Sequence, residues 1–375
     1  MLNRALVFSQ LQTLSTSLFA DTSAEYQIAQ QSWQRICADP LFVYKVRAAN
    51  TALLVPDWSE VIGTNIKIEN IVNDYSILGI DGSQIYPDRH QGTSCFLVNI
   101  GSIILYYGIC SGQRVLLNSQ PYLFTPETSP AGMFGPELVD CLRQELELEI
   151  GLALSKKTDV SNENYPFLFL FDGSIIFWHL ASKENNLKEH FLNKYLLQLD
   201  QLFQARVLNA GYISLPKSKE LVNLVRLELS NFKYVQQEQN DELKHVSDTT
   251  IASFFLEPHC RTICFKSNAE IGALYPDHLR PYFFYLNVGT EIARVEIPEW
   301  IALAPDLVET VARIILNQCI KGKGYPVALA EAHEQAVVKG PDRDFFYHVI
   351  TKLSLEKKHR ILPSQKSLKK KGIAI

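Results

Sequence analysis

The sequence predicts an α/β fold with a mixed central sheet flanked by helices, preceded by a helical N-terminal segment. Two short apolar runs, Tyr75–Ile80 and Pro166–Phe171, each end at an Asp-Gly-Ser triplet, as buried strands end at a turn. Between them, Pro136–Ser155 repeats apolar residues at helical spacing and begins with proline, which the first turn of a helix tolerates. Strands that alternate with helices are typical of α/β proteins.

The remaining elements follow from the same patterns. We expect two further strands at 94–100 and 103–110, joined by a turn at Gly101-Ser102. Another strand is expected at 211–215, and a strand pair at 281–288 and 290–297. A loop rich in proline and glycine is expected at 121–135. Apolar residues at helical spacing predict helices at 184–207, 219–229, 305–321 and 328–338.

The chain divides into three regions that differ in hydrophobic pattern and charge. Residues 1–70 read as a helical N-terminal region, and residues 71–350 read as one α/β domain. Residues 351–375 form a basic tail with eight Lys or Arg against one Glu. We expect this tail to be a solvated segment, and the alternative is that it adds non-specific phosphate contacts.

The composition is that of a soluble globular protein, with 47% hydrophobic and 20% charged residues. No apolar run is long enough to span a bilayer and no signal peptide is visible, so we expect a cytoplasmic protein without membrane contact. The seven cysteines lie mostly inside apolar runs, which favours reduced thiols over disulfides. His259, Cys260 and Cys264 lack a second ligand pair, so we do not expect zinc there.

The two Asp-Gly-Ser triplets place an acid at the end of two predicted strands. Neighbouring strand ends lie about 4.8 Å apart, so Asp81 and Asp172 can converge where open α/β sheets place their sites. Carboxylates at short range repel one another, and a divalent cation relieves that repulsion. Oxygen ligands favour Mg²⁺ or Mn²⁺ over zinc.

A third acid is expected from the helix between the two strands. Glu145, Glu147 and Glu149 alternate there and cannot all face the same way. Leu138, Leu142, Leu146 and Ala153 mark an apolar stripe; Glu149 falls within it and Glu145 at its edge. Glu147 falls on the opposite side, four residues after Arg143, a spacing suited to a surface ion pair. We therefore expect Glu149 to face inward, with Glu145 as the alternative.

Two further side chains lie near the C-terminal end of the α/β domain. Tyr325 begins the segment Gly324–His333, and His333 follows eight residues later on the predicted helix. A phenol and an imidazole suit phosphate positioning or a metal position that no carboxylate takes.

Five short motifs in order resemble the NurA nuclease family over residues 75 to 345. They are Ile80-Asp81-Gly82-Ser83-Gln84-Ile85-Tyr86-Pro87, Phe171-Asp172-Gly173-Ser174, Gly211-Tyr212-Ile213-Ser214, Arg294-Val295-Glu296-Ile297-Pro298 and Gly324-Tyr325-Pro326 with Ala332-His333. The resemblance implies a ribonuclease-H-like core and a manganese-dependent DNA nuclease with 5′–3′ exonuclease and single-strand endonuclease activity. It also implies a homodimer that works with a HerA-type hexameric ATPase, a translocase, in DNA end processing or double-strand break repair.

The resemblance also implies which residues form the site. Asp81, a helix glutamate and Asp172 would bind Mn²⁺, or Mg²⁺ in its place, and Tyr325 and His333 would be further catalytic residues. The family pattern alone does not choose among the three glutamates, so Glu149 depends on the helical-face argument. His333 would ligate the metal or orient its ligands, and Tyr325 would hold a phosphate oxygen.

Two other functions remain open at this point. A phosphotransferase of the sugar-kinase and actin-like class also uses an Asp-Gly turn after its first strand, but no Gly-rich adenosine loop follows residue 290. A non-catalytic adaptor that docks a translocase at a DNA end is the second alternative. Lys217, Lys219 and Arg226 are candidates for backbone phosphate contacts, although exposed helix charge explains them equally well.

Overall fold

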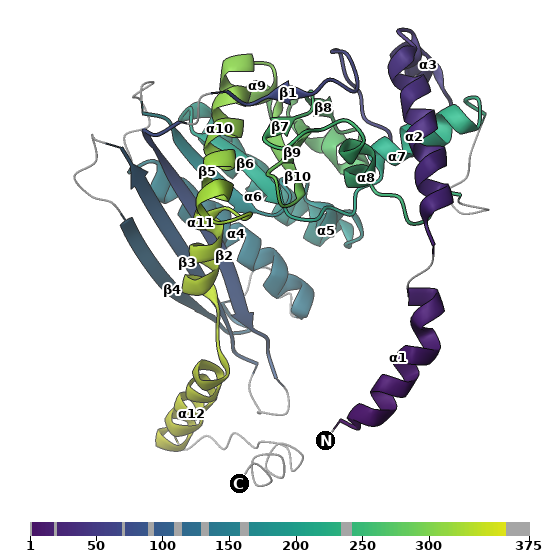
Figure 1. Ribbon diagram of the computed structural model, residues 1–375. Coiled ribbons are helices and arrows are strands. Elements are labelled where there is room, and N and C mark those ends of the chain that lie inside the picture. Colours follow the sequence, from purple (N-terminus) through teal and green to yellow (C-terminus); the bar gives the residue numbers. More distant parts are fainter. Residues whose placement is uncertain are drawn as a thin grey trace.

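The computed structural model describes residues 2–18, 21–69, 72–88, 94–108, 115–128, 135–157, 165–233 and 242–357. Within these residues, ten strands form one mixed sheet in the order β1-β7-β9-β10-β6-β5-β2-β3-β4, with β8 paired to β9 (Figure 1). The strands are β1 (Ile66–Lys67), β2 (Tyr75–Ile85), β3 (Phe96–Tyr107), β4 (Val115–Phe124), β5 (Phe167–Asp172), β6 (Leu208–Ile213), β7 (Cys260–Arg261), β8 (Phe265–Lys266), β9 (Pro281–Asn287) and β10 (Ile292–Pro298).

The helices connect and cover these strands. They are α1 (Arg4–Leu18), α2 (Ser23–Ala38), α3 (Phe42–Ala48), α4 (Pro136–Ser155), α5 (Trp178–Ala181), α6 (Asn185–Gln204), α7 (Glu220–Leu229), α8 (Asp248–Ser253), α9 (Glu299–Ala302), α10 (Pro305–Lys321), α11 (Val327–Ala336) and α12 (Gly340–Glu356). Two 3₁₀ turns, Glu270–Leu274 and Asp277–Leu279, precede β9. The mixed α/β fold with a helix-flanked sheet is therefore confirmed.

The three central strands of the sheet run parallel, and antiparallel strands lie on both sides of them. β2, β3 and β4 form an antiparallel meander, while β5 runs parallel to β2 and β6 runs parallel to β5. Helices α4 and α6 provide the crossovers before and after β5. β10 then adds antiparallel to β6, and β9 adds antiparallel to β10.

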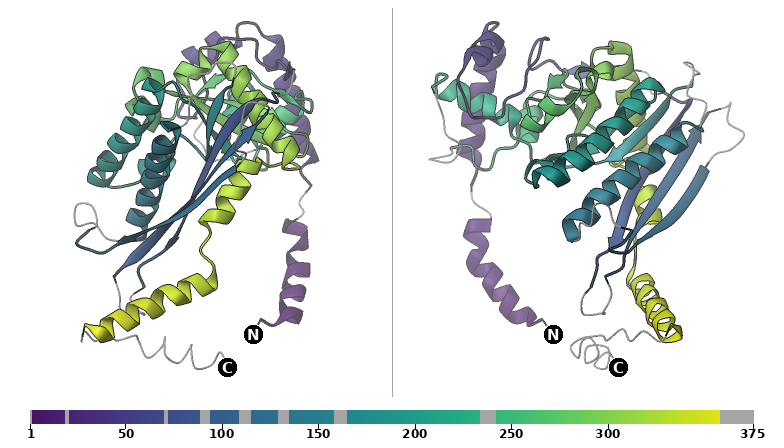
Figure 2. Two further views of the ribbon diagram at one scale, coloured as in Figure 1. Left: turned by 90° about the vertical axis from the view of Figure 1, so that its left-hand side faces the viewer. Right: turned by 180° about the vertical axis from the view of Figure 1, so that it is seen from behind.

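Helices cover both faces of the central strands. α10 and α11 lie on one face, and α4 and α6 lie on the other (Figures 1 and 2). Helix α11 approaches β2 and β3 very closely, because both strands carry a glycine beneath it. A Cβ atom on Gly79 would lie 2.3 Å from the carbonyl oxygen of Ala328, and one on Gly101 would lie 2.4 Å from that of Ala332. These glycines let the backbone of α11 rest on the sheet.

Two expectations for the first strands were wrong. The predicted turn at Gly101-Ser102 does not form, since β3 continues through it as a single strand from Phe96 to Tyr107. Glycine stands there because α11 needs the space, which a turn signal cannot distinguish. The predicted loop from Pro121 begins inside β4, an edge strand where proline is tolerated because its missing N–H faces no partner.

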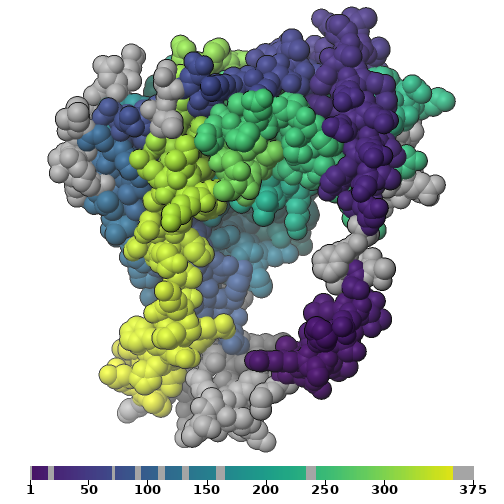
Figure 3. Space-filling view, in the orientation of Figure 1, coloured from purple at the N-terminus to yellow at the C-terminus, as the bar shows by residue number. Residues whose placement is uncertain are grey.

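The N-terminal region is helical, as expected, and ends at a short strand. Helices α2 and α3 pack with α7 and α8 around an apolar cluster that includes Trp33, Phe42 and Leu224, and β1 joins the sheet beside β7. Helix α1 stands apart from this body, with Leu6 and Phe8 exposed (Figures 1 and 3).

The predicted basic tail lies mostly outside the described residues, which end at 357. Its first residues belong to α12, which continues to Glu356. The six cysteines in the described segments are free thiols, as expected, and Cys110 lies outside these segments. Within the same segments no helix has both the length and the apolar character needed to cross a membrane.

Candidate active site

Asp81 and Asp172 lie side by side on two parallel strands. The register of β2 and β5 pairs Ile80 with Phe171, so the next residues along the two strands are the two aspartates. β5 ends at Asp172, whereas β2 continues to Ile85. The structure thus brings together the two strand-end acids that the sequence singled out.

Two residues near α11 hold these aspartates. His333 Nδ1 lies 2.8 Å from Asp81 Oδ2, and the hydroxyl of Tyr325 donates a hydrogen bond of 3.0 Å to Asp172 Oδ1. Tyr325 precedes α11, and its ring packs edge-on against Tyr212 of β6. His333 lies six residues into the helix and its side chain is 58% exposed. Both residues chosen from the sequence therefore contact the aspartates directly.

The acid that faces the aspartates from α4 is Glu147. Its side chain is buried, with 11% of its surface exposed, and Arg143 Nη1 lies 3.9 Å from its Oε1. Arg143 also donates a hydrogen bond of 3.0 Å to the carbonyl of Gly82, the residue after Asp81. Glu147 and Arg143 therefore reach the strand that carries Asp81 from the opposite face of the sheet.

The expected orientation of the helix glutamates was wrong. Glu149 is exposed, and Glu145 pairs at 2.6 Å with Lys194 of α6. The apolar stripe was misread because Ala153, counted as part of it, is exposed. Gly151, which was not counted, packs so tightly that a Cβ atom would lie 1.9 Å from the ring of Phe169.

A signal for the correct glutamate was present in the sequence. Gly151 lies four residues after Glu147, so the two share a helix face. A helical glycine can mark close packing on a sheet, although it adds nothing to an apolar count. Arg143 was also interpreted only as a surface partner, whereas it is half-buried at the site.

The carboxylates perturb one another electrostatically. The pKa of Glu147 is raised from 4.5 to about 8, chiefly by burial and also by Asp81 and Asp172, against the lowering effect of Arg143. The pKa of Asp172 is also raised, first by desolvation and then by Asp81, against the lowering effects of Tyr325 and His333. Two acids whose ionisation is hindered by burial and by neighbouring carboxylates form a site that favours added positive charge.

By the chemistry of its donors the set fits a hard divalent cation, which prefers carboxylate oxygens, although Asp81, Glu147 and Asp172 do not converge on one point in this structure. Arg143, the nearest cation to Glu147, lies 3.9 Å from it, beyond hydrogen-bonding distance. In the described part of the chain, no three His, Cys, Asp or Glu side chains surround a common point as a metal site.

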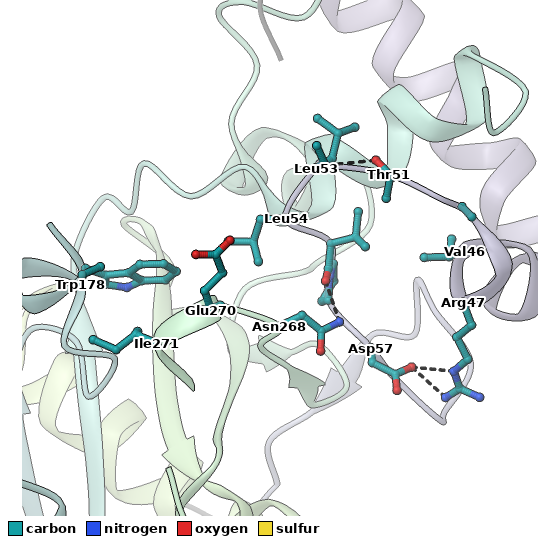
Figure 4. Close-up of a pocket in the computed structure, with 16 residues that line it drawn as sticks. Val46, Arg47, Thr51, Leu53, Leu54, Asp57, Trp178, Asn268, Glu270 and Ile271 are labelled. Carbon is teal, nitrogen blue, oxygen red and sulfur yellow. Dashed lines mark hydrogen bonds and ion pairs between the residues drawn. The ribbon is translucent and has the colours of Figure 1, made fainter. Parts of the chain in front are cut away.

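Two cavities lie near the segment that follows Asp172. One, of about 430 Å³, is lined by Gly173 and Ser174 together with Lys217 and Lys219. The other, of about 640 Å³, runs from Trp178 to the Arg47–Asp57 ion pair (Figure 4).

The two lysines proposed for phosphate contacts therefore lie beside the candidate site. Arg226, proposed with them, instead donates a hydrogen bond of 2.6 Å to Asn223 on its own helix.

Comparisons with known proteins point to one family. A family model described as the NurA domain matches residues 75–338, more than half of the chain. One similar crystal structure is described as NurA with manganese; it has a TM-score of 0.41 and 12% sequence identity, and the match covers 90% of this chain and 98% of that chain. A second, described as NurA, has a TM-score of 0.39 and 12% identity, with 87% of this chain and 95% of that chain covered. A third, described as NurA bound to dAMP and manganese, has a TM-score of 0.37 and 10% identity, with 90% of this chain and 94% of that chain covered. No curated protein matches the chain. On the extent of the family model, the chain belongs to the NurA family.

Proposed function

We propose that this protein is a metal-dependent DNA nuclease that hydrolyses phosphodiester bonds beside Asp81 and Asp172. One observation carries the proposal: Asp81 and Asp172 are neighbours in register, and both raise the pKa of the buried Glu147. Such a cluster favours a cation, and a cation at clustered carboxylates is a common means of hydrolysing phosphodiesters. Membership of the NurA family supports the same chemistry.

The metal ligands in this proposal are Asp81, Glu147 and Asp172, with Glu147 in place of Glu149. A bound cation would lower the pKa of a water nucleophile and stabilise negative charge on the phosphate. Tyr325 holds the Asp172 carboxylate by its hydrogen bond, and its raised pKa keeps the phenol protonated as a donor. His333 orients Asp81 and, being largely exposed, is also within reach of a phosphate oxygen.

Manganese is our first choice of metal, with magnesium as the alternative, since both prefer oxygen ligands. We extend the proposal to the homodimer, the HerA-type hexameric ATPase partner, the cytoplasmic location and the 5′–3′ exonuclease and single-strand endonuclease activities. These points are supported by the family alone. They would be tested by sedimentation, co-purification with a matched ATPase, and cleavage of DNA labelled at either end.

We also infer that the core is ribonuclease-H-like. The inference is supported by the antiparallel meander of β2, β3 and β4, which is followed by the parallel strands β5 and β6. The helical crossovers α4 and α6 flank β5 in the chain. The candidate acids then fall on the first and fourth strands of this unit.

The test is cleavage of end-labelled single- and double-stranded DNA by the full chain with Mn²⁺, Mg²⁺ or EDTA. We expect products that need the metal and disappear in Asp172→Asn. Absence of cleavage by the wild-type protein with every metal, even with a matched translocase added, would reject the nuclease. It would favour instead an adaptor that docks a translocase at DNA ends. Detectable ATP binding by the isolated chain would favour the phosphotransferase.

A further inference from the structure

The segment that follows Asp172 is anchored by a buried acid on another strand. Glu296, on β10, is wholly buried. Its Oε2 lies 2.6 Å from the hydroxyl of Ser174 and accepts hydrogen bonds from the backbone N–H of Ile175 at 3.0 Å and of Ile176 at 3.4 Å. One carboxylate oxygen therefore gathers three donors from the first turn after the candidate metal ligand.

The other oxygen of Glu296 is fixed by an arginine that is itself held in place. Arg294 Nε donates to Glu296 Oε1 at 2.8 Å, and the remaining guanidinium nitrogens bind Glu220 of α7. Arg294 and both acids are at most 3% exposed at their side chains. The guanidinium also stacks 3.6 Å from the centroid of the Phe283 ring. The carboxylate of Glu296 thus has a single well-defined position.

Burying an ion-pair network carries a large desolvation penalty. Buried ion pairs often stabilise a fold no more than well-packed apolar side chains of similar volume would. A buried ion-pair network therefore suggests a role other than stability. Glu220 receives one hydrogen bond from outside the ion pairs, from the hydroxyl of Ser267 at 3.4 Å. The hydrogen bonds that Glu296 accepts from a loop all come from Ser174, Ile175 and Ile176. Their endpoint indicates that the purpose of Glu296 is to fix this loop.

The anchored segment is joined to Asp172 by a short and constrained connection. Gly173 adopts φ +120°, a conformation that residues with a side chain rarely adopt. Its N–H donates to the carbonyl of Tyr212 at 2.9 Å, which extends the β5–β6 pairing by one step. Movement at Ser174 would therefore be transmitted to Asp172 over two residues.

We propose that Glu296 is a positioning residue that sets the Asp172 carboxylate for metal binding by holding residues 174–176. This inference rests on the proposed nuclease function, because it concerns the same metal site. Tyr325 fixes the side chain of Asp172 from one face of the sheet, and Glu296 holds the residues that follow Asp172 from the other.

The decisive comparison is Glu296→Gln against Glu220→Gln in the full chain. Both variants remove one negative charge from Arg294, so both should lower Tm. Glu220 makes no hydrogen bond to residues 174–176 in the described structure, which makes it the matched control. The measurements are amide hydrogen exchange of the 173–178 segment and Mn²⁺ affinity by titration. Ser174→Ala, which removes one contact to Glu296 and leaves the ion pairs intact, provides the comparison if Glu296→Gln does not fold.

We expect faster exchange of the segment in Glu296→Gln, and an Mn²⁺ affinity lower by about 10-fold, the scale of losses when groups that support metal ligands are changed. Glu220→Gln, which disturbs Glu296 only through Arg294, should change the exchange of the segment and the Mn²⁺ affinity much less than Glu296→Gln does, despite its lower Tm. Ser174→Ala should resemble Glu296→Gln with smaller changes.

Two results would overturn the inference: unchanged exchange and Mn²⁺ affinity in Glu296→Gln, or equal losses of affinity in both glutamate variants. Failure of the wild-type protein to bind Mn²⁺ or cut DNA would instead defeat the proposed function. The exchange measurement distinguishes the two cases, because it needs neither metal nor DNA.

Discussion

Glu147 approaches the strand of Asp81 through the space that Gly82 leaves open. A Cβ atom on Gly82 would lie 2.7 Å from Glu147 Oε1 and 2.6 Å from Arg143 Cγ, closer than real side chains pack. Because Gly82 directly follows Asp81, the second residue of the Asp-Gly-Ser triplet serves the site as well as the strand. The glycine admits an acid from the α4 face to a site whose other groups lie on the α11 face.

The first prediction concerns that space. Gly82→Ala should fold, because the atoms in its way belong to flexible side chains, but it should displace Glu147 and lower Mn²⁺ affinity by about 10-fold. Gly340→Ala is the control, since a Cβ atom there meets nothing within 4 Å. Metal titration and Tm of both variants test the prediction, and wild-type affinity in Gly82→Ala would contradict it.

The second prediction separates the helix glutamates. Glu147→Gln should lower DNA cleavage by about 100-fold or more, since changes to residues that merely support metal ligands already cost about 10- to 100-fold in affinity or activity. Its fold should be preserved, because a raised pKa means that the neutral form suits the buried site. Glu149→Gln, on the exposed side of the same helix, should retain wild-type rates. The reverse pattern would restore Glu149 as the site acid.

Much of the scaffold could be predicted from the sequence, because long periodic segments determine their own structure. The helix at Pro136–Ser155 and the helix at Pro305–Lys321 have the predicted bounds. The turn at Gly101 was wrong because that glycine serves the approach of α11, a tertiary contact that no local pattern contains.

The residues of the candidate site likewise divide into those that local sequence predicts and those that depend on tertiary contacts. Asp81 and Asp172 were predictable because strand ends concentrate functional groups, and Tyr325 and His333 because they match the family motif. Glu147 was missed, since a count of apolar residues overlooks its neighbour Gly151, and since its orientation also depends on the absence of a side chain at Gly82. Glu296 lay within a recognised motif, but its role depends on which loop its carboxylate meets.

The third prediction is a pH dependence of stability in the absence of metal. The pKa of Glu147 is raised from 4.5 to about 8. Between these values the folded protein keeps a proton that the unfolded chain releases, so the free energy of unfolding should fall as pH rises. For one group the slope is at most about 1.4 kcal/mol per pH unit. Denaturant unfolding in EDTA should show this slope in the wild type and lack it in Glu147→Gln. An identical pH dependence in both would contradict the assignment.

The fourth prediction concerns the hydrogen bond between Tyr325 and Asp172. Tyr325→Phe removes a donor that lowers the pKa of Asp172, so the acidic limb of the rate profile should move to higher pH. The rate on the plateau should fall by about 10-fold, the equivalent of about 1.5 kcal/mol for a hydrogen bond to a charged group. Cleavage rates measured across pH test both effects. A uniformly slower enzyme with an unmoved acidic limb would show that Tyr325 acts elsewhere.

The most direct test of the central claim is a titration of Mn²⁺ into metal-free protein, monitored by electron paramagnetic resonance. The account predicts that the wild type and Glu149→Gln bind Mn²⁺ alike, while Asp81→Asn, Glu147→Gln and Asp172→Asn each lose binding by about 100-fold or more. Wild-type affinity in all three variants would contradict the claim that these carboxylates form one metal centre.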